Sequence, residues 1–151
     1  MLLPKEVWKE IPGWEGYYMA STHGRIKSVD RYVISNGRGK YFKKGKILRL
    51  ETDKDGYKKI QLNKNGKAKK YLVHRLVAMC FIPNPNNLPE INHKDENRAN
   101  NHVSNLEWCN RKYNCNYGTR NEKVSNSLKG KIAWNKGKNN THTISVTILA
   151  E

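Results

Sequence analysis

The sequence predicts an α+β fold: a small antiparallel-sheet module at the N-terminus, a central region of hairpins and short helices, and an extended or helical basic tail. Two patterns favour this class. Short segments of alternating polar and apolar residues, separated by turn residues, dominate the first half of the chain. Helical spacing of apolar residues is confined to short stretches further on. The 151 residues are 36% hydrophobic, which is enough for one small core with appended segments.

The N-terminal region, residues 1–56, is expected to form a module of short antiparallel strands. Pro12 and Gly13 mark its first turn, and residues 25–29 alternate polar and apolar side chains as a half-buried strand does. The strands predicted in this region cover residues 7–11, 17–20, 25–29 and 47–50.

The central region, residues 57–118, should start with a hairpin and a helix. The run Asn63-Lys64-Asn65-Gly66 separates two alternating segments, 57–62 and 67–72, and is a strong hairpin signal. A short buried helix should follow and end before Pro83. It is predicted because apolar residues recur at helical spacing at Leu72, Val73, Leu76, Val77 and Cys80.

The rest of the central region should form a strand, a polar loop, a second strand and a helix. These elements are predicted over residues 90–92, 105–109 and 110–116, with a stop near Gly118. Residues 119–151 are expected to be a basic DNA-binding tail that includes a helix over 119–128.

The charge of the chain restricts its partners. It has 29 Lys and Arg against 13 Asp and Glu, a formal net charge of +16. Such an excess favours a polyanion, with nucleic acid first and an anionic membrane second. No apolar run reaches the length of a membrane span or of a signal peptide, so we expect neither. Three cysteines without CxxC spacing indicate a reducing, intracellular compartment and no structural zinc.

Basic residues are concentrated on both sides of an electrically balanced centre. Residues 40–70 hold 12 basic and 3 acidic side chains, and residues 118–140 hold 6 and 1, whereas residues 90–114 hold 4 of each. This distribution favours contacts with a DNA backbone beside a working centre, although a charge run can also be only a solvated face. The candidate DNA-binding residues are Lys43, Lys44, Lys46, Lys58, Lys69, Lys70, Arg75, Lys129, Lys131, Trp134, Lys136 and Lys138. Trp134 could stack on a sugar or base, or anchor the tail to the domain.

Four polar residues in the balanced centre match the needs of phosphodiester cleavage. His93 follows a predicted strand, and a hairpin followed by a helix would bring residues 92–93 close to Asn114. A neutral imidazole at His93 can accept the proton of an attacking water. Oxygens of Asn92 and Asn114 can hold one divalent ion, Mg²⁺ or Mn²⁺, with substrate phosphate completing the shell. Asn105 can hold the turn after His93 through hydrogen bonds to loop backbone.

The segment INHKDENRANNHVSNLEWCNRKYN, residues 91–114, resembles the HNH family of endonucleases, which have the ββα-metal or His-Me finger fold. His93, Asn105 and Asn114 stand at the three signature positions of that family. Residues 6–31 resemble the nuclease-associated module of phage and intron-encoded homing endonucleases, and residues 71–85 resemble the segment that joins it to the finger. Residues 127–138 are similar to a small DNA-binding motif found after such nucleases.

The resemblance implies a metal-dependent DNA endonuclease, a site-directed nicking enzyme. We expect it to act on double-stranded DNA, as a monomer. The resemblance also implies a phage or mobile-element protein in the cytoplasm of a bacterial host. One residue departs from the pattern: several relatives carry Asp or His where this chain has Asn92, whose neutral oxygen binds a cation less strongly. Asp95 could contribute through water. The alternatives are a catalytically inactive DNA-binding regulator with the same fold and a basic RNA-binding protein. His74 is expected to be a packing residue of the helix.

Overall fold

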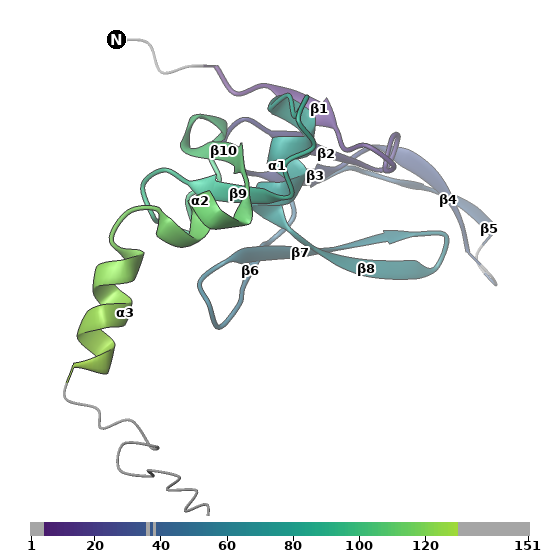
Figure 1. Cartoon of the computed structure of the whole chain (residues 1–151). Helices are drawn as coiled ribbons and strands as arrows, with labels where there is room; N and C mark the ends of the chain where they lie inside the picture. Colours follow the sequence, from purple (N-terminus) through teal and green to yellow (C-terminus); the bar gives the residue numbers. More distant parts are fainter. Residues whose placement is uncertain (1–4, 36, 38, 130–151) are drawn as a thin grey trace, which may run out of the picture.

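The computed structural model describes residues 5–35, 37 and 39–129 and confirms the α+β class (Figure 1). Within these residues there are four small antiparallel sheets, and three of them contact one central helix, α1 (Val73–Phe81). No helix in this described part is long and apolar enough to cross a bilayer. The predicted tail residues Lys131, Trp134, Lys136 and Lys138 lie outside the described residues.

The first sheet has the order β1 (Trp8–Glu10), β2 (Tyr18–Ser21), β3 (Ile26–Ser28). Its core side is formed by residues such as Ala20 and Ile26, both fully buried. These strands confirm three of the four predicted for the N-terminal region. The fourth, at 47–50, was wrong: Ile47 forms only an isolated bridge with Lys27, and the next strand, β6 (Glu51–Thr52), starts after it.

A hairpin of β4 (Arg31–Ser35) and β5 (Gly39–Lys43) was not predicted. None of its residues whose burial is described is buried: all of β5 is exposed, and in β4 the half-buried Arg31 and Val33 alternate with Tyr32 and Ile34, which are 66% and 81% exposed. Tyr32 faces Phe42 across the ladder, with ring centroids 5.5 Å apart. The hairpin therefore projects from the body of the molecule without a buried face to produce the usual strand signal (Figure 1).

The third sheet, β6, β7 (Lys58–Lys64) and β8 (Lys67–Leu72), contains the hairpin that the sequence predicts. Asn65 and Gly66 form its two-residue turn with φ of 53° and 77°, the left-handed geometry that suits the twist of paired strands. Pairing of β6 with β7 crosses residue 56, where the first region boundary was placed. The boundaries at residues 56 and 118 stay predictions.

Helix α1 forms the centre of the core. Val73, Leu76, Val77 and Ala78 are at most 1% exposed, and they pack against side chains of β2, β7 and β10. The N-cap residue Leu72 makes no side-chain hydrogen bond to the first turn, so the helix is stabilised by packing and not by capping at its N-terminus. The predicted helix before Pro83 is confirmed.

The last part of the described chain is a hairpin and two helices. Strands β9 (Glu90–His93) and β10 (Leu106–Cys109) pair antiparallel, with Asn92 opposite Glu107 and His93 opposite Leu106. Between them, a loop ends in a short 3₁₀ turn, η1 (Val103–Asn105), so Asn105 precedes the second strand and does not begin it as predicted. Helices α2 (Arg111–Asn116) and α3 (Arg120–Leu128) follow, and α2 lies against β9.

Candidate active site

The hairpin β9–β10 and helix α2 place the predicted residues around one cleft. Asn92 and His93 lie at the end of β9, and Asn114 lies in α2, which packs against that strand. The cleft has a volume of about 690 Å³, and its lining includes Asn92, His93 and Asn114. Asn105 is buried beneath the loop outside this lining. The hairpin and helix thus bring Asn92 and His93 close to Asn114, although more than twenty residues separate them in the sequence.

His93 is buried and held from several sides. Only 5% of it is exposed, and its Nε2 lies 3.2 Å from Oδ1 of Asn101. The ring of His74, on α1, meets the His93 ring edge-on with centroids 5.0 Å apart, and the Tyr57 ring is 6.0 Å away. Burial lowers the pKa of His93 below its usual value, and the Asn101 hydrogen bond and the charge of Asp95 oppose that shift. Neutral imidazole is therefore favoured in the free protein.

Asn105 ties the loop together. Its Nδ2 donates to Oδ1 of Asp95 and to the backbone oxygen of Asn100, both over 2.8 Å, and its Oδ1 accepts from the Asp95 amide over 3.0 Å. Its backbone oxygen also accepts from the amide of Lys94 over 2.9 Å. These bonds fix the turn that directly follows His93.

Asn92 and Asn114 are each oriented by a carboxylate. Nδ2 of Asn92 donates to Glu107 over 2.8 Å, and Nδ2 of Asn114 donates to Glu90 over 2.6 Å. Because each amide nitrogen is occupied by an acceptor, each Oδ1 is left as the atom that can accept or ligate. The donor set is entirely oxygen, amide and carboxylate, which fits a hard divalent cation such as Mg²⁺ or Mn²⁺. Among the described residues, no three His, Cys, Asp or Glu side chains cluster as a metal site of their own.

The three cysteines differ in chemistry from these oxygen donors. Cys80, Cys109 and Cys115 are free thiols, and burial raises the pKa of Cys80 and of Cys109 to about 11. A thiolate, the form that binds metal, is therefore disfavoured at both.

Several contributors to the site were missed by sequence reasoning. Tyr57 comes from the start of the central region and carries the guanidinium of Arg98 over its ring at 5.0 Å, while Nη1 of Arg98 donates to the Asp55 backbone. Glu90 lies two residues before Asn92 on β9, and Glu107 lies opposite Asn92 on the paired strand β10. In the sequence, Glu90 could have been indicated only by its spacing of two residues from Asn92, and Glu107 only by its expected pairing with Asn92 in the hairpin.

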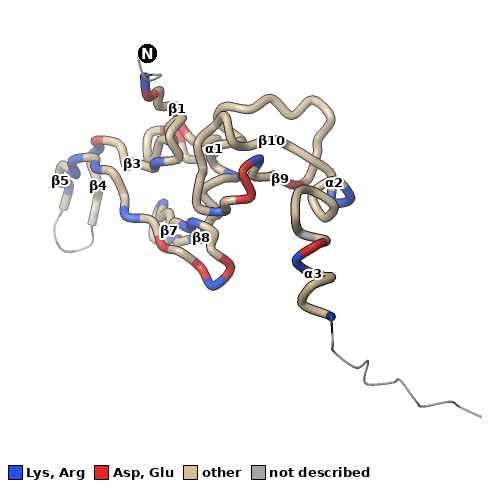
Figure 2. Tube along the Cα trace, turned by 90° about the vertical axis from the view of Figure 1, so that its left-hand side faces the viewer, with Lys and Arg blue, Asp and Glu red and all other residues tan. Residues whose placement is uncertain are grey.

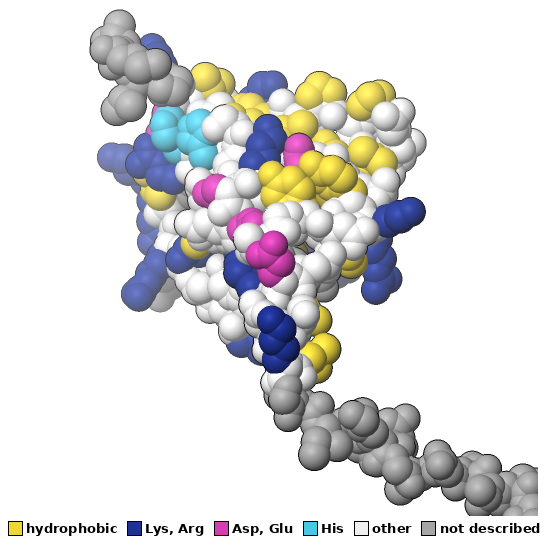
Figure 3. Space-filling model, turned by 60° about the vertical axis from the view of Figure 1, so that its left-hand side comes forward, with side chains coloured by type: hydrophobic (Ala, Val, Ile, Leu, Met, Phe, Trp, Pro, Cys, Tyr) yellow, Lys and Arg dark blue, Asp and Glu magenta, His cyan; other side chains and the backbone are white. Residues whose placement is uncertain are grey.

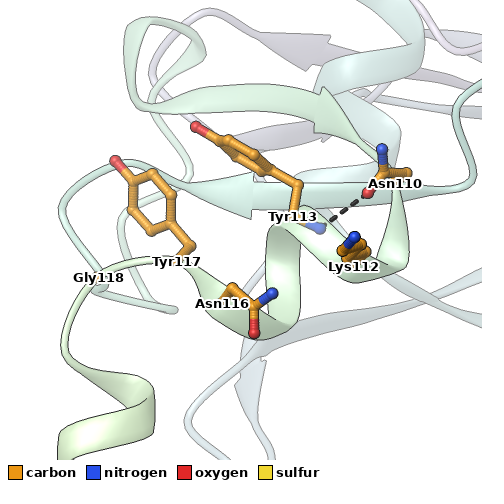
Figure 4. Close-up of a pocket in the computed structure, with 6 residues that line it drawn as sticks. All are labelled: Asn110, Lys112, Tyr113, Asn116, Tyr117 and Gly118. Atoms are coloured by element: carbon orange, nitrogen blue, oxygen red, sulfur yellow. Dashed lines mark hydrogen bonds between the residues drawn. The ribbon is translucent and has the colours of Figure 1, made fainter.

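A second, more open recess of about 450 Å³ lies along the outer side of α2 (Figure 4). Tyr113 and Tyr117 line it with ring centroids 5.5 Å apart, and Asn110 caps the helix by accepting from the Tyr113 amide over 2.8 Å. The hydroxyl of Tyr117 donates to the Lys94 backbone, which joins this helix to the loop after β9. None of the predicted site residues lines this recess.

Charged residues are unevenly placed. Figure 2 shows Lys and Arg along both hairpins, β4–β5 and β7–β8. Figure 3 shows histidine side chains gathered at one edge of another face. The rings of His23 and His102, the two described histidines that are not buried, meet edge-on with centroids 5.1 Å apart.

The predicted DNA-binding residues in the described part are on the surface. Lys58 is half-buried and donates to Thr52, and Arg75 is exposed but donates to the Pro89 backbone over 2.8 Å. Lys70 pairs with Glu51 at 3.2 Å. The exposed ones also include Lys43, Lys44, Lys46, Lys69 and Lys129.

Comparison with known proteins gives a consistent result. A family model described as the NUMOD4 motif matches residues 6–63, which confirms the expected N-terminal module and extends it. An uncharacterized HNH endonuclease of Acanthamoeba polyphaga mimivirus is 44% identical over 104 residues, 68% of this chain and 31% of the relative. The DNA endonuclease I-HmuI of Bacillus phage SP01 is 39% identical over 107 residues, 71% of this chain and 54% of the relative.

The fold matches as well. A solved structure that describes DNA binding and cleavage by the HNH homing endonuclease I-HmuI is 32% identical, with a TM-score of 0.59, over 80% of this chain and 66% of that one. The chain spans about a third to a half of the length of the curated relatives given above.

Proposed function

Because the chain is a homologue of the HNH homing endonucleases in sequence and in fold, we propose that it is a metal-dependent endonuclease that hydrolyses a phosphodiester bond in double-stranded DNA. The observation that carries the proposal is the cleft in which Asn92, His93 and Asn114 meet. The mimivirus and phage relatives, named as an HNH endonuclease and a DNA endonuclease, support the reaction class.

His93 is the general base in this proposal. A neutral imidazole near the cleft can take a proton from the attacking water, and burial favours that neutral form. Asn105 acts indirectly, since its bonds to Asp95 and Asn100 fix the loop that follows His93.

Asn92 and Asn114 would hold one divalent ion, Mg²⁺ or Mn²⁺, through their Oδ1 atoms. When bound, the ion would stabilise negative charge on the phosphate and on the leaving oxygen. The residues around it have separate tasks: Glu107 and Glu90 fix the two amides, and Arg98 lies at the cleft beside Tyr57.

DNA binding is proposed for the basic hairpins and the tail that flank the neutral centre. Exposed lysines such as Lys43 and Lys44 can contact phosphates, and Lys69 could do so by leaving the Tyr71 ring, over which its Nζ lies at 5.3 Å. We also propose that the protein acts as a monomer that nicks one strand, because one chain provides one complete cleft. The phage relative supports a role in the cytoplasm of a bacterial host.

A catalytically inactive DNA-binding regulator is the second candidate. It is favoured by one observation: the ligand position at Asn92 carries a neutral amide where a carboxylate would bind a cation more strongly.

Plasmid nicking separates the two candidates. The full chain is incubated with supercoiled DNA and Mg²⁺ or Mn²⁺, with and without EDTA. We expect nicking that EDTA abolishes and that His93→Ala lowers by about 10²- to 10⁴-fold, while DNA binding stays within a few-fold. Asn86→Ala, at an exposed loop residue outside the cleft lining, is the control and should nick normally. Metal-independent binding without nicking would favour the regulator.

A further inference from the structure

A neutral imidazole has one N–H and one lone pair, and its partner decides which nitrogen carries the proton. For His93, the partner of Nε2 is Oδ1 of Asn101, 3.2 Å away in a buried position. An amide oxygen can only accept, so the bond requires Nε2–H. No group among the described residues hydrogen-bonds to Nδ1 of His93. The lone pair is therefore on Nδ1.

Asn101 is itself buried and is held by the N-terminal module. Only 4% of it is exposed. The turn after β2 passes so close that a Cβ at Gly24 would lie 2.8 Å from Cβ of Asn101 and 2.9 Å from its backbone oxygen. Gly24 also has φ of +77°, and its amide closes the turn by donating to Ser21 over 3.0 Å. Two residues further along the loop, the amide of Val103 donates to the backbone oxygen of Thr22 over 2.9 Å. The module and the loop thus meet directly behind His93.

We propose that Asn101 is a positioning residue that fixes His93 in the Nε2–H form, and that the Gly24 turn of the N-terminal module sets where Asn101 stands. This rests on the proposed function in one respect, the role of His93 as base. The NUMOD4 region, matched over residues 6–63, is then part of the catalytic centre as well as a neighbouring module. The edge-on ring of His74 completes the enclosure of the imidazole from the side of α1.

The state of His93 can be measured without any reaction. In the ¹⁵N-labelled full chain, without metal and at about pH 8, where histidine is neutral, long-range ¹H–¹⁵N correlation distinguishes the two forms of each imidazole. The signals of His93 are identified by their loss in His93→Ala. We expect Nε2–H in the wild type and in Asn101→Asp, which keeps an acceptor oxygen, and a mixture of both forms in Asn101→Ala.

The kinetic test uses the same variants. Asn101→Ala should lower kcat for nicking by about 10- to 100-fold, the usual loss when a group that orients a reactive histidine is removed, with KM within about two-fold. Asn86→Ala, at an exposed loop asparagine, should have no effect.

The contribution of the turn is tested with paired glycine variants. Gly24→Ala should lower kcat and mix the His93 forms. Gly13→Ala introduces the same backbone strain at φ of +80°, but its Cβ meets nothing within 4 Å, so His93 and kcat should not change. Equal effects of the two substitutions would refute the link between the module and His93.

Failure of the inference and failure of the proposed function are distinguishable. A wild-type His93 with the proton on Nδ1 would overturn the positioning role, whether or not the chain cleaves DNA. Asn101→Ala that folds, keeps Nε2–H and nicks at the wild-type rate would overturn it too. If Asn101→Ala does not fold, the comparison of Gly24→Ala with Gly13→Ala, by kcat and by the proton position on His93, tests the inference in its place. A chain that never nicks DNA but shows Nε2–H, lost in Asn101→Ala, would refute the nuclease proposal alone.

Discussion

The carboxylate of Glu96 accepts two hydrogen bonds from Thr119, one from its backbone amide and one from its hydroxyl, each over 2.7 Å. Lys123, one turn into α3, adds a third contact at 3.1 Å. Three residues after His93, the chain is therefore fastened to the start of the helix that leads into the basic tail. The charge also suits the N-terminal end of a helix, where backbone amides are unpaired.

Loss of this contact should release α3. The hydrogen bonds from Thr119 lower the pKa of Glu96 to about 2, so the group is ionised at neutral pH. A lowered carboxyl pKa stabilises the fold above the unfolded value near 4.5, and the contribution disappears as the pH falls toward 2. In Glu96→Gln, amide hydrogen exchange in α3 should be several-fold faster at pH 7, and the difference from wild type should vanish in acid. Glu122→Gln, in the first turn of the same helix but without a bond to the loop, is the control. An equal increase in exchange there would contradict the role of Glu96 in holding α3.

One divalent ion should lie between Oδ1 of Asn92 and Oδ1 of Asn114, at about 2.0–2.5 Å from each. Crystals with DNA and Mn²⁺, measured for anomalous scattering, would locate it. A site with cysteine ligands would refute the assignment.

Charge at Asn92 should change the response to metal. Asn92→Asp would place a carboxylate beside Glu107, whose oxygen is now 2.8 Å from the Asn92 amide nitrogen. Like charges at that distance repel, so the variant should melt at a lower temperature than wild type in EDTA and gain more stability from Mn²⁺. Thermal melts with and without Mn²⁺ measure this. An Asn92→Asp protein that is indifferent to Mn²⁺ would exclude residue 92 as a ligand.

DNA affinity should fall steeply with salt. If six to ten of the basic residues contact phosphates, affinity drops by roughly 10³- to 10⁵-fold between 50 and 200 mM salt. Lys44→Ala, and Lys136→Ala or Lys138→Ala in the tail, should each reduce the salt slope by about one. Lys59→Ala is the control, because Lys59 already pairs with Asp53 at 2.9 Å.

The tail has its own signature in the same titrations. Trp134→Ala should weaken binding with an unchanged slope, since stacking releases no counterions. Deletion of residues 127–151 should keep low-salt activity and lose affinity as salt rises. Unchanged affinity and slope after the deletion would show that the tail does not contact DNA.

His74 should lower the stability of the fold, although its ring contacts His93. Its Nδ1 is buried without a hydrogen-bond partner among the described residues, and burial lowers its pKa to about 3. An unsatisfied buried polar atom typically costs about 1–3 kcal/mol, so His74→Leu should be more stable by a comparable amount and nick more slowly. A histidine with a lowered pKa destabilises the fold as the pH falls from about 6.5 toward 3, so the advantage of the leucine variant should grow over that range. Chemical denaturation at several pH values measures it, and a pH-independent difference would contradict the burial of a neutral ring.

The finger was predictable from sequence because its signals are local. His93 follows a strand, Asn114 lies in the helix after a turn, and the spacing between them is that of one hairpin and one helix. The hairpin 31–43 was not predictable, since residues such as Ile34 and Phe42 are apolar yet exposed and leave no alternation. The contact of Gly24 with Asn101 is a property of the assembled fold: nothing in the sequence near either residue indicates it.

Helix α1 has a consequence for how the molecule folds. It is the element that touches all three packed sheets, with Val73, Leu76 and Val77 in the shared core, and none of those sheets has more than three strands. Small sheets of this kind are marginal alone. The packed part of the chain should therefore unfold in a single cooperative transition, with no intermediate in which the finger survives without the N-terminal sheet. The folding nucleus of this part would form late, because α1 must pack against strands from both ends of the described sequence before any of those strands gains stability.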